Sequence, residues 1–488
     1  MQKTRKTVFS WGQKLVNMQG TKEFVEAVKN REIDIVEHTK NVLKECKRLN
    51  AEYNYFNEIC DELALNQAKN LSQNPYGKLC GLPVTIKDNI CVKGVETTAG
   101  SRILKGYKPE FNATVVQRII DEGGIIIGKT AQDEFGYGSF CTNVGLDYSI
   151  PLNPVDKERV CGGSSGGCAG ITNALSVPHI SIAESTGGSI ANPASFCGVQ
   201  GLCPTYGRVS RNGLLDFANS LDKIGPMARK TEDLALMLEI IAGNDLNDST
   251  TINSNTENYQ DYLKKDLKGM KIGVIKESFS ETIDPVIQKN MNKTIESLKE
   301  LGAECHEVSL QMNFEYGVQV YFLLATTETS TNLAKFCGIR YGAQEELNNE
   351  HFNDYFKKIR SKHFGKEAKR RIMLGTFARM AGHRDAYYVK AAKIRSLMIQ
   401  EYKDLFTEFD LLLSPVTPIL PPKINEIDKL SLLQTYMTDQ LTTGPNLCGM
   451  PHLTFNAGYL DNLPVGLMLT ADHLQEKKLI QAGHALEK

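Results

Sequence analysis

The 488-residue sequence contains no run of about 20 apolar residues, the length that a membrane-spanning helix needs. It also has no surplus of charge, because 56 lysines and arginines face 57 aspartates and glutamates, a formal net charge of −1. Proteins that bind nucleic acid usually carry a basic surface. We therefore expect no membrane segment, and we expect any RNA to be held by a partner.

The sequence also lacks paired cysteines, since its 12 cysteines are scattered singly and none form a C-x-x-C motif. This spacing argues against a zinc or iron–sulfur site, and we expect no metal. Without a secretory apolar segment, reduced thiols and a cytoplasmic location are expected. Residues 1–20 contain four lysines or arginines and no acid. We interpret them as an N-terminal extension, with a segment targeting an organelle matrix as the alternative.

The apolar pattern alternates between helical and strand spacing. Residues 112–130 fit a helix followed by an all-apolar strand, which is usually buried between helix layers. Further strands are predicted at 179–183, 270–275 and 409–413, and helices at 21–49 and 284–301. These alternating elements predict an α/β sandwich around a large, mostly buried sheet, with N-terminal helices.

The polar segment 244–262 contains few aliphatic residues and is interpreted as a surface connection. We expect residues 21–488 to form a single domain. Its N-terminal half would end near residue 243, and its C-terminal half would begin near residue 263.

Two glycine-rich segments, 162–167 and 186–189, each contain serine. Four glycines around Ser164 and Ser165 indicate backbone conformations that side chains would obstruct, or a close approach of the backbone to a ligand. Consecutive N–H groups at the strand-to-helix turn 186–189 can hold negative charge that develops on a substrate oxygen. The alternatives are a phosphate loop or linker for the first segment and a tight turn with a serine cap for the second. The first segment lacks the Lys-Ser/Thr ending of a phosphate loop.

Lys87 ends the apolar stretch 83–86. Burial penalises an ammonium ion, so a buried lysine can act as general base for a serine hydroxyl. The alternative for Lys87 is an ion pair with the adjacent Asp88. Cys161 and Cys168, which flank the first glycine-rich segment, are alternative nucleophiles without a histidine nearby in sequence. The ordered lysine and serines predict acyl transfer without histidine or metal.

Taken together, Lys87-Asp88-Asn89, the 162–167 segment and Thr186-Gly187-Gly188-Ser189-Ile190 resemble the amidase signature family. The resemblance implies an α/β/α sandwich around a large mixed sheet. It also implies a Ser–cis-Ser–Lys triad with Ser189 as nucleophile, Ser164 as bridging serine and Lys87 as base. The implied oxyanion hole consists of the N–H groups of Thr186, Gly187 and Gly188.

Within that family, the segments 204–211, 332–342 and 365–388 resemble the glutamine-hydrolysing subunits of tRNA-dependent amidotransferases. Such subunits supply ammonia for conversion of Glu-tRNA(Gln) to Gln-tRNA(Gln), and in many organisms of Asp-tRNA(Asn) to Asn-tRNA(Asn). The resemblance implies that Arg371 holds the glutamine carboxylate and Asp439 its ammonium group. Without the resemblance, Arg371 is interpreted as a surface arginine and Asp439 as an ordinary polar residue.

The resemblance also implies partners. A kinase-like B subunit would bind tRNA and hold ATP and Mg²⁺, and a small C subunit would complete the complex. The chain itself would need no cofactor and would meet tRNA only through the complex. The alternatives are a stand-alone amidase acting on small aliphatic or aryl amides and a non-catalytic scaffold, against which the intact triad counts.

The sequence departs from the family pattern Asp-Thr-Gly-Gly-Ser-Ile-Arg at two positions, where it has Ser185 and Ala191. The loss of both an acid and an arginine leaves no charge without its partner. Glu184, one position earlier, is the candidate for a substitute carboxylate. The interval between Ser164 and Ser189 is also one residue longer than the family pattern.

Overall fold

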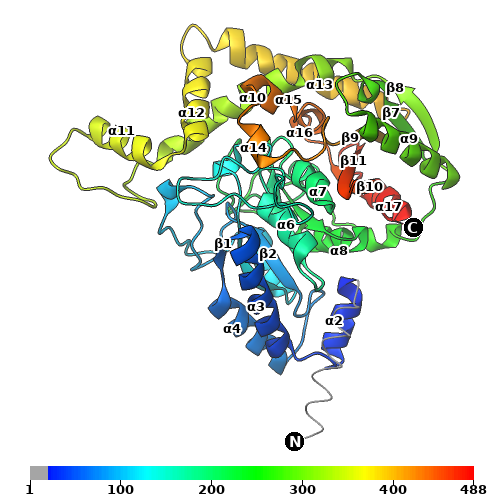
Figure 1. Ribbon diagram of the computed structural model, residues 1–488, viewed down its shortest axis with the longest axis horizontal. Coiled ribbons are helices and arrows are strands. Elements are labelled where there is room, and N and C mark those ends of the chain that lie inside the picture. The colour runs from blue at the N-terminus through cyan, green and yellow to red at the C-terminus, as the bar shows by residue number, and fades with distance from the viewer. Residues whose placement is uncertain (1–19, 488) are drawn as a thin grey trace, which may run out of the picture.

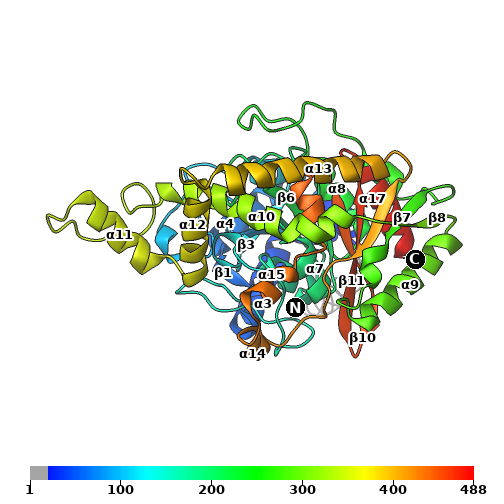
Figure 2. The ribbon, with the colours of Figure 1, turned by 90° about the horizontal axis from the view of Figure 1, so that it is seen from above.

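The computed structural model describes residues 20–487, so the predicted extension lies outside them except for its last residue. Eleven strands of the described chain form one sheet (Figures 1 and 2). The strands are β1 (Phe56–Ile59), β2 (Pro83–Lys87), β3 (Ile125–Thr130), β4 (Ile180–Ser185), β5 (Gln200–Cys203), β6 (Lys223–Ala228), β7 (Lys271–Ile275), β8 (Glu304–Val308), β9 (Leu411–Pro415), β10 (His452–Leu460) and β11 (Leu463–Ala471).

The sheet order is β1-β3-β2-β4-β6-β5-β10-β11-β9-β7-β8. The triplets β3-β2-β4 and β9-β7-β8 are parallel, whereas the other neighbours are antiparallel. The predicted mixed sheet is therefore confirmed. The two halves of the sequence meet where β5 pairs with β10, at Leu202 and Leu453.

The helices cover the sheet in groups. Helices α6 and α7 contact each other and the central strands, and α8 contacts α5 and α17 in another group. The helices are α2 (Thr21–Lys29), α3 (Ile35–Tyr53), α4 (Asp61–Gln73), α5 (Thr114–Asp121), α6 (Gly166–Ala174), α7 (Ala191–Cys197), α8 (Thr231–Ile241), α9 (Pro285–Glu300), α10 (Gln311–Asn332), α11 (Phe352–His363), α12 (Lys366–Arg379), α13 (Lys390–Leu405), α14 (Ile424–Ile427), α15 (Leu432–Met437), α16 (Thr443–Leu447) and α17 (Glu476–Leu486).

Local sequence explains several boundaries. The predicted helix–strand unit at 112–130 is confirmed as α5 and β3, and Gly123 between them has a φ of 79°. Only glycine adopts that backbone conformation at little cost. Asp284 caps α9 by accepting a hydrogen bond from the N–H of Val286 at 2.9 Å, and Gly302 follows its end with a φ of 94°.

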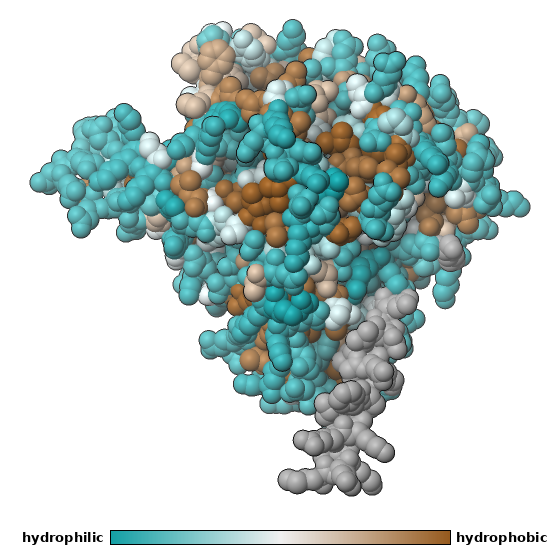
Figure 3. All heavy atoms as spheres, in the orientation of Figure 1, coloured by the Kyte–Doolittle hydropathy of each residue, from teal (hydrophilic) through white to brown (hydrophobic). Residues whose placement is uncertain are grey.

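Helices α10, α12 and α13 pack together. They lie along one side of the molecule, and α11 projects beyond them (Figures 1 and 2). The projecting segment is mainly hydrophilic at its surface, whereas apolar side chains gather over the body (Figure 3). No helix within residues 20–487 is long and apolar enough to cross a membrane.

Candidate active site

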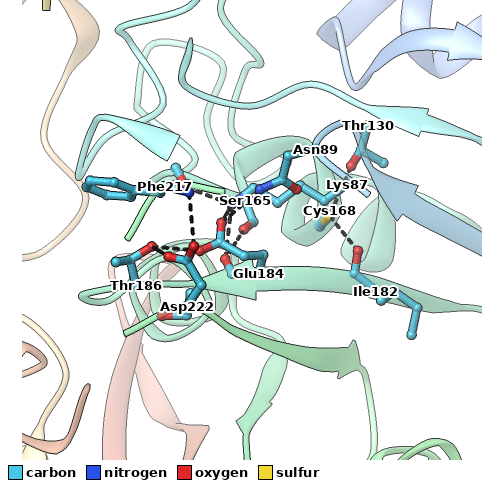
Figure 4. A network of polar contacts seen from close by, with 12 residues as sticks. Lys87, Asn89, Thr130, Ser165, Cys168, Ile182, Glu184, Thr186, Phe217 and Asp222 are labelled. Atoms are coloured by element: carbon cyan, nitrogen blue, oxygen red, sulfur yellow. Dashed lines mark hydrogen bonds and ion pairs between the residues drawn. The ribbon is translucent and has the colours of Figure 1, made fainter. Parts of the chain in front are cut away.

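Lys87 is the last residue of β2, and its side chain is fully buried. Its Nζ lies 2.7 Å from Ser164 Oγ. It also lies 2.9 Å from Glu184 Oε2 and 3.0 Å from the Glu184 carbonyl oxygen (Figure 4). The alternative ion pair with Asp88 is not formed, because the Asp88 carboxylate lies 3.3 Å from the Nζ of Lys129. The structure thus joins two of the three predicted triad residues directly.

Ser164 lies in the glycine-rich loop before α6, and the peptide bond that precedes it is cis. The loop needs its glycines. Gly162 has a φ of 81°, and a Cβ on Gly163 would lie 2.2 Å from Asp133 Oδ2. A side chain at either position would displace the loop that places Ser164 Oγ against Lys87.

Ser189 lies in the loop between β4 and α7 and is 6% exposed. Across the described residues, its hydroxyl makes no hydrogen bond to Ser164 or to another group. A Cβ on Gly187 would lie 2.4 Å from Tyr321 Cζ, and one on Gly188 would lie 2.5 Å from Thr442 Oγ1. These glycines therefore let two second-half residues approach the backbone N–H groups that were predicted to form the oxyanion hole.

Glu184 links the lysine to a second buried carboxyl group (Figure 4). Its Oε2 accepts a hydrogen bond from Asn89 Nδ2 at 3.1 Å, and its Oε1 lies 2.7 Å from Thr186 Oγ1. Thr186 Oγ1 also lies 2.8 Å from Asp222 Oδ1. Burial and the nearby charge of Glu184 raise the pKa of Asp222 well above its usual value. Glu184 is thus the carboxyl group that contacts the lysine. The residue that follows it, Ser185, has no carboxyl group.

The two cysteines that flank the Ser164 loop are fully buried. Burial raises the pKa of the Cys168 thiol to about 11 and raises that of Cys161 well above its ordinary value. A thiol with a raised pKa remains protonated at neutral pH and is a poor nucleophile. This environment favours the serines over the cysteines as the reacting groups.

Arg371 lies on α12 and is only 4% exposed, so the interpretation as a surface arginine is wrong. Its Nε donates a hydrogen bond to Glu367 Oε1 at 2.9 Å. Its guanidinium carbon lies 5.0 to 5.9 Å from four ring centroids, those of Phe322, Tyr137, Phe217 and Tyr436. Within the described chain, neither terminal nitrogen of Arg371 makes a hydrogen bond. Both therefore remain available to an anionic ligand.

Asp439 follows α15 and is also buried. Its carboxylate accepts hydrogen bonds from Ser139 Oγ at 2.7 Å and from Asn192 Nδ2 at 2.6 Å. Burial raises the pKa of Asp439 to about 6, although both hydrogen bonds oppose that shift. An acid with this pKa is largely ionised at neutral pH and can attract a cation.

The residues that hold Asp439 also contact both serine loops. The carbonyl oxygen of Ser139 accepts the N–H of Gly163 at 2.7 Å, and the N–H of Asn192 donates to the Gly188 carbonyl at 2.8 Å. Ser139 and Arg371 line the same cavity, which has a volume of about 300 Å³. The structure therefore brings the predicted binding residues from the second half to the serine loops of the first.

Sequence reasoning missed several residues of this site. Glu367 lies four positions before Arg371, and this helical i,i+4 spacing could have identified the pair. Asp222 and Tyr321 come from distant segments and gave no local signal. Within residues 20–487, no group of three or more His, Cys, Asp or Glu side chains is arranged to hold a metal ion.

Comparisons with known proteins agree with the observed fold. The model of the family described as Amidase matches residues 37–480. The A subunit of the glutamyl-tRNA(Gln) amidotransferase of Clostridium botulinum (strain Alaska E43 / Type E3) is 41% identical over 471 residues, which cover 96% of each chain. The second A-type subunit of this amidotransferase in Clostridium acetobutylicum is 43% identical over 475 residues, covering 95% of this chain and 98% of the relative.

Solved structures show the same relationship. The crystal structure of the A subunit of the Thermotoga maritima glutamyl-tRNA(Gln) amidotransferase superposes with a TM-score of 0.80 at 32% identity, covering 97% of this chain and 95% of that one. A bacterial aryl acylamidase, at 22% identity and a TM-score of 0.83, shares the fold. The chain belongs to the amidase signature family.

Proposed function

We propose that this chain is the glutamine-hydrolysing subunit of a tRNA-dependent amidotransferase that converts Glu-tRNA(Gln) to Gln-tRNA(Gln). The observation that carries the proposal is the placement of a buried arginine and a buried aspartate beside the serine loops. Glutamine presents an α-carboxylate and an α-ammonium group at one end and the reacting amide at the other. Full-length relatives with 41% and 43% identity bear the name of this subunit.

Arg371 binds the α-carboxylate of glutamine through its two free terminal nitrogens. Asp439 binds the α-ammonium group, and Ser139 and Asn192 hold its carboxylate in place. The side-chain amide then extends towards Ser189. Binding both charged groups at one end of a short ligand favours glutamine over amides that lack either charge.

Ser189 attacks the amide carbon of glutamine. Its proton passes to Ser164, and the proton of Ser164 passes to Lys87, with which it is already in contact. The N–H groups of Thr186, Gly187 and Gly188 hold the oxyanion; loss of one such donor typically costs on the order of 3 kcal/mol of barrier. The proton returns to the leaving nitrogen as ammonia departs. Water then attacks the acyl-enzyme, and glutamate is released.

The ammonia serves a partner reaction. A kinase-like B subunit binds tRNA and uses ATP and Mg²⁺ to activate the carboxyl group of the tRNA-bound glutamate, and a small C subunit completes the complex. The chain described here holds no cofactor of its own and acts in the cytoplasm. Residues 21–488 form its single domain, and both halves contribute to the site.

Substrate analogues test this function. L-Glutamine is compared with 4-aminobutanamide, which lacks the α-carboxylate, and with glutaric acid monoamide, which lacks the α-ammonium group. We expect kcat/KM to fall by at least about 100-fold for each, because each leaves a buried charge of the site without its partner. Equal rates for all three, with simple aryl amides cleaved as fast, would identify a stand-alone amidase.

A further inference from the structure

Lys87 Nζ has three polar neighbours, and their number limits how a neutral lysine can direct its hydrogens and its lone pair. They are Ser164 Oγ, Glu184 Oε2 and the Glu184 carbonyl oxygen. A neutral amine has two hydrogens and one lone pair, whereas an ammonium has three hydrogens. The lone pair must face Ser164 if Lys87 is to accept its proton. Both hydrogens of the neutral amine must then point to the two oxygens of Glu184.

We propose that Glu184 is a positioning residue for Lys87, which directs the lysine lone pair to Ser164 and balances the ammonium charge that forms there. This inference rests on the proposed reaction and adds to it a residue outside the Ser–Ser–Lys triad. The family pattern has an acid and an arginine where this chain has Ser185 and Ala191. The acid that pairs with the triad lysine in this chain is Glu184.

The hydrogen bonds around Glu184 hold its carboxylate in this role. Oε2 faces Lys87 and Asn89, and Oε1 faces Thr186. The Thr186 hydroxyl has one hydrogen but touches a carboxyl oxygen of Glu184 and one of Asp222. Both contacts are hydrogen bonds only if one of the two carboxyl groups is protonated. Glu184 faces the lysine, so the proton belongs on Asp222, which donates it to Thr186 while Thr186 donates to Glu184.

Other titratable side chains interact with Lys87 or Glu184 and bear on any pH profile. They are Asp133, Cys141, Cys168, Cys203, Asp222 and Tyr321. Burial raises the pKa of all of them, and that of Asp133 to about 7. The titration of Asp133 therefore overlaps the neutral range. The pH profiles of the variants are therefore compared in the natural chain and again in an Asp133→Asn background.

Glu184→Gln removes the charge without removing the hydrogen bonds. The amide oxygen can still face Lys87 and Asn89, and the amide nitrogen can donate to Thr186. Thr186 can then donate to an ionised Asp222, so the negative charge moves away from the lysine. Losing an anion next to a base makes its neutral form appear at lower pH and weakens it as a base.

The experiment measures the rate at which a fluorophosphonate labels Ser189 as a function of pH. The serine oxygen bonds to phosphorus, fluoride leaves, and the serine proton passes through Ser164 to Lys87, so no glutamine is needed. For Glu184→Gln we expect the pH midpoint to fall by about one unit or more and the plateau rate to fall about 10-fold. Glu184→Asp keeps the charge at a greater distance from the lysine. Its pH midpoint should lie between those of the natural chain and Glu184→Gln.

Three controls make the outcome specific. Ser189→Ala confirms the labelled residue, Glu52→Gln changes an exposed ion pair, and Asp222→Asn keeps a donor towards Thr186 and should keep the natural midpoint. A slower Glu184→Gln enzyme with an unchanged midpoint would overturn the inference, because a merely structural residue gives that result. If Glu184→Gln does not fold, the Glu184→Asp midpoint decides in the same way. A chain that labels as predicted but ignores glutamine would refute the proposed function and leave the positioning role intact.

Discussion

The Nζ of Lys87 and the Oε2 of Glu184 lie 2.9 Å apart in a fully buried ion pair. The two residues come from β2 and β4, which are neighbouring parallel strands. Parallel strands end at the same edge of a sheet, so a lysine that ends one strand meets an acid near the end of the next. The reacting groups of this chain therefore gather at the carboxyl edge of β2 and β4.

The triad assignment predicts that Ser189→Ala reduces glutamine hydrolysis by a factor on the order of 10⁴ or more. Lys87→Ala and Ser164→Ala should each give a comparable loss, because residues that act as a unit fail together. Steady-state ammonia release measures the effect. A Ser165→Ala variant, altered at the neighbouring serine, should retain far more activity than Ser164→Ala, and equal losses would refute the assignment.

The role of Arg371 is tested by Arg371→Lys, which keeps the charge but loses the planar fork that can bind a carboxylate through two nitrogens. We expect KM for glutamine to rise about 10- to 100-fold with a smaller change in kcat, consistent with about 1.4–3 kcal/mol of lost charge-assisted hydrogen bonding. Arg379→Lys on the same helix, where the arginine Nε donates to Ser330 Oγ, is the matched control. An unchanged KM in Arg371→Lys would exclude this residue from substrate binding.

The pKa of about 6 at Asp439 predicts a loss of glutamine binding in acid. As the pH falls through 6, the carboxylate takes up a proton and no longer attracts the substrate ammonium group. Between pH 7 and pH 5, kcat/KM for glutamine should therefore fall about 10-fold. Asp439→Asn should show low kcat/KM throughout and lose this limb, and a variant that keeps the same acid limb would show that another group causes it.

Buried carboxyl groups predict that stability rises as the pH falls from 8 to 6.5. Burial raises the pKa of Asp133 and of Glu134 to about 7, so each binds a proton in the folded chain before the unfolded chain does. Stability from a raised acid is present below its unfolded pKa and is lost as pH rises through the folded value. The two groups together contribute about 1.5 kcal/mol over this interval.

Below pH 6.5 the further gain in stability slows, because two buried histidines oppose the two acids. Burial lowers the pKa of His38 to about 4 and that of His179 to about 3, so the unfolded chain binds protons there first. Urea unfolding at several pH values measures the free energy of unfolding. We expect the free energy of unfolding to decline from pH 6.5 to pH 8, with a flatter slope over that interval in Asp133→Asn. A free energy of unfolding that increases steadily up to pH 8 would be inconsistent with these raised pKa values.

Much of the fold followed from local pattern. The strand at 125–127 was predicted because an all-apolar strand must be buried on both faces. The capped helix near 284–301 was predicted because its apolar residues lie on one face, which must be buried. The order of the eleven strands could not be predicted, because pairing such as that of β5 with β10 joins residues about 250 positions apart. Ser164 could be predicted to lie in a tight loop, because the glycines around it permit backbone conformations that other residues rarely adopt.

The partners within the site were less predictable. Lys87 was expected either to be a base or to pair with Asp88, and the sequence could not show that Lys129 would bind Asp88 instead. Glu184 was a candidate only because Ser185 and Ala191 depart from the family pattern. Asp222 acts through a threonine hydroxyl from a segment 36 positions away, and such a contact depends on tertiary packing alone.

The proposed glutaminase function is decided by ammonia release from L-glutamine, measured with and without the B and C subunits and Glu-tRNA(Gln). We expect weak release by the chain alone, a marked increase when partners, ATP, Mg²⁺ and charged tRNA are added, and loss of both in Ser189→Ala. The proposal would be wrong if partners left the release unchanged, or if Ser189 hydrolysed simple amides without any turnover of glutamine.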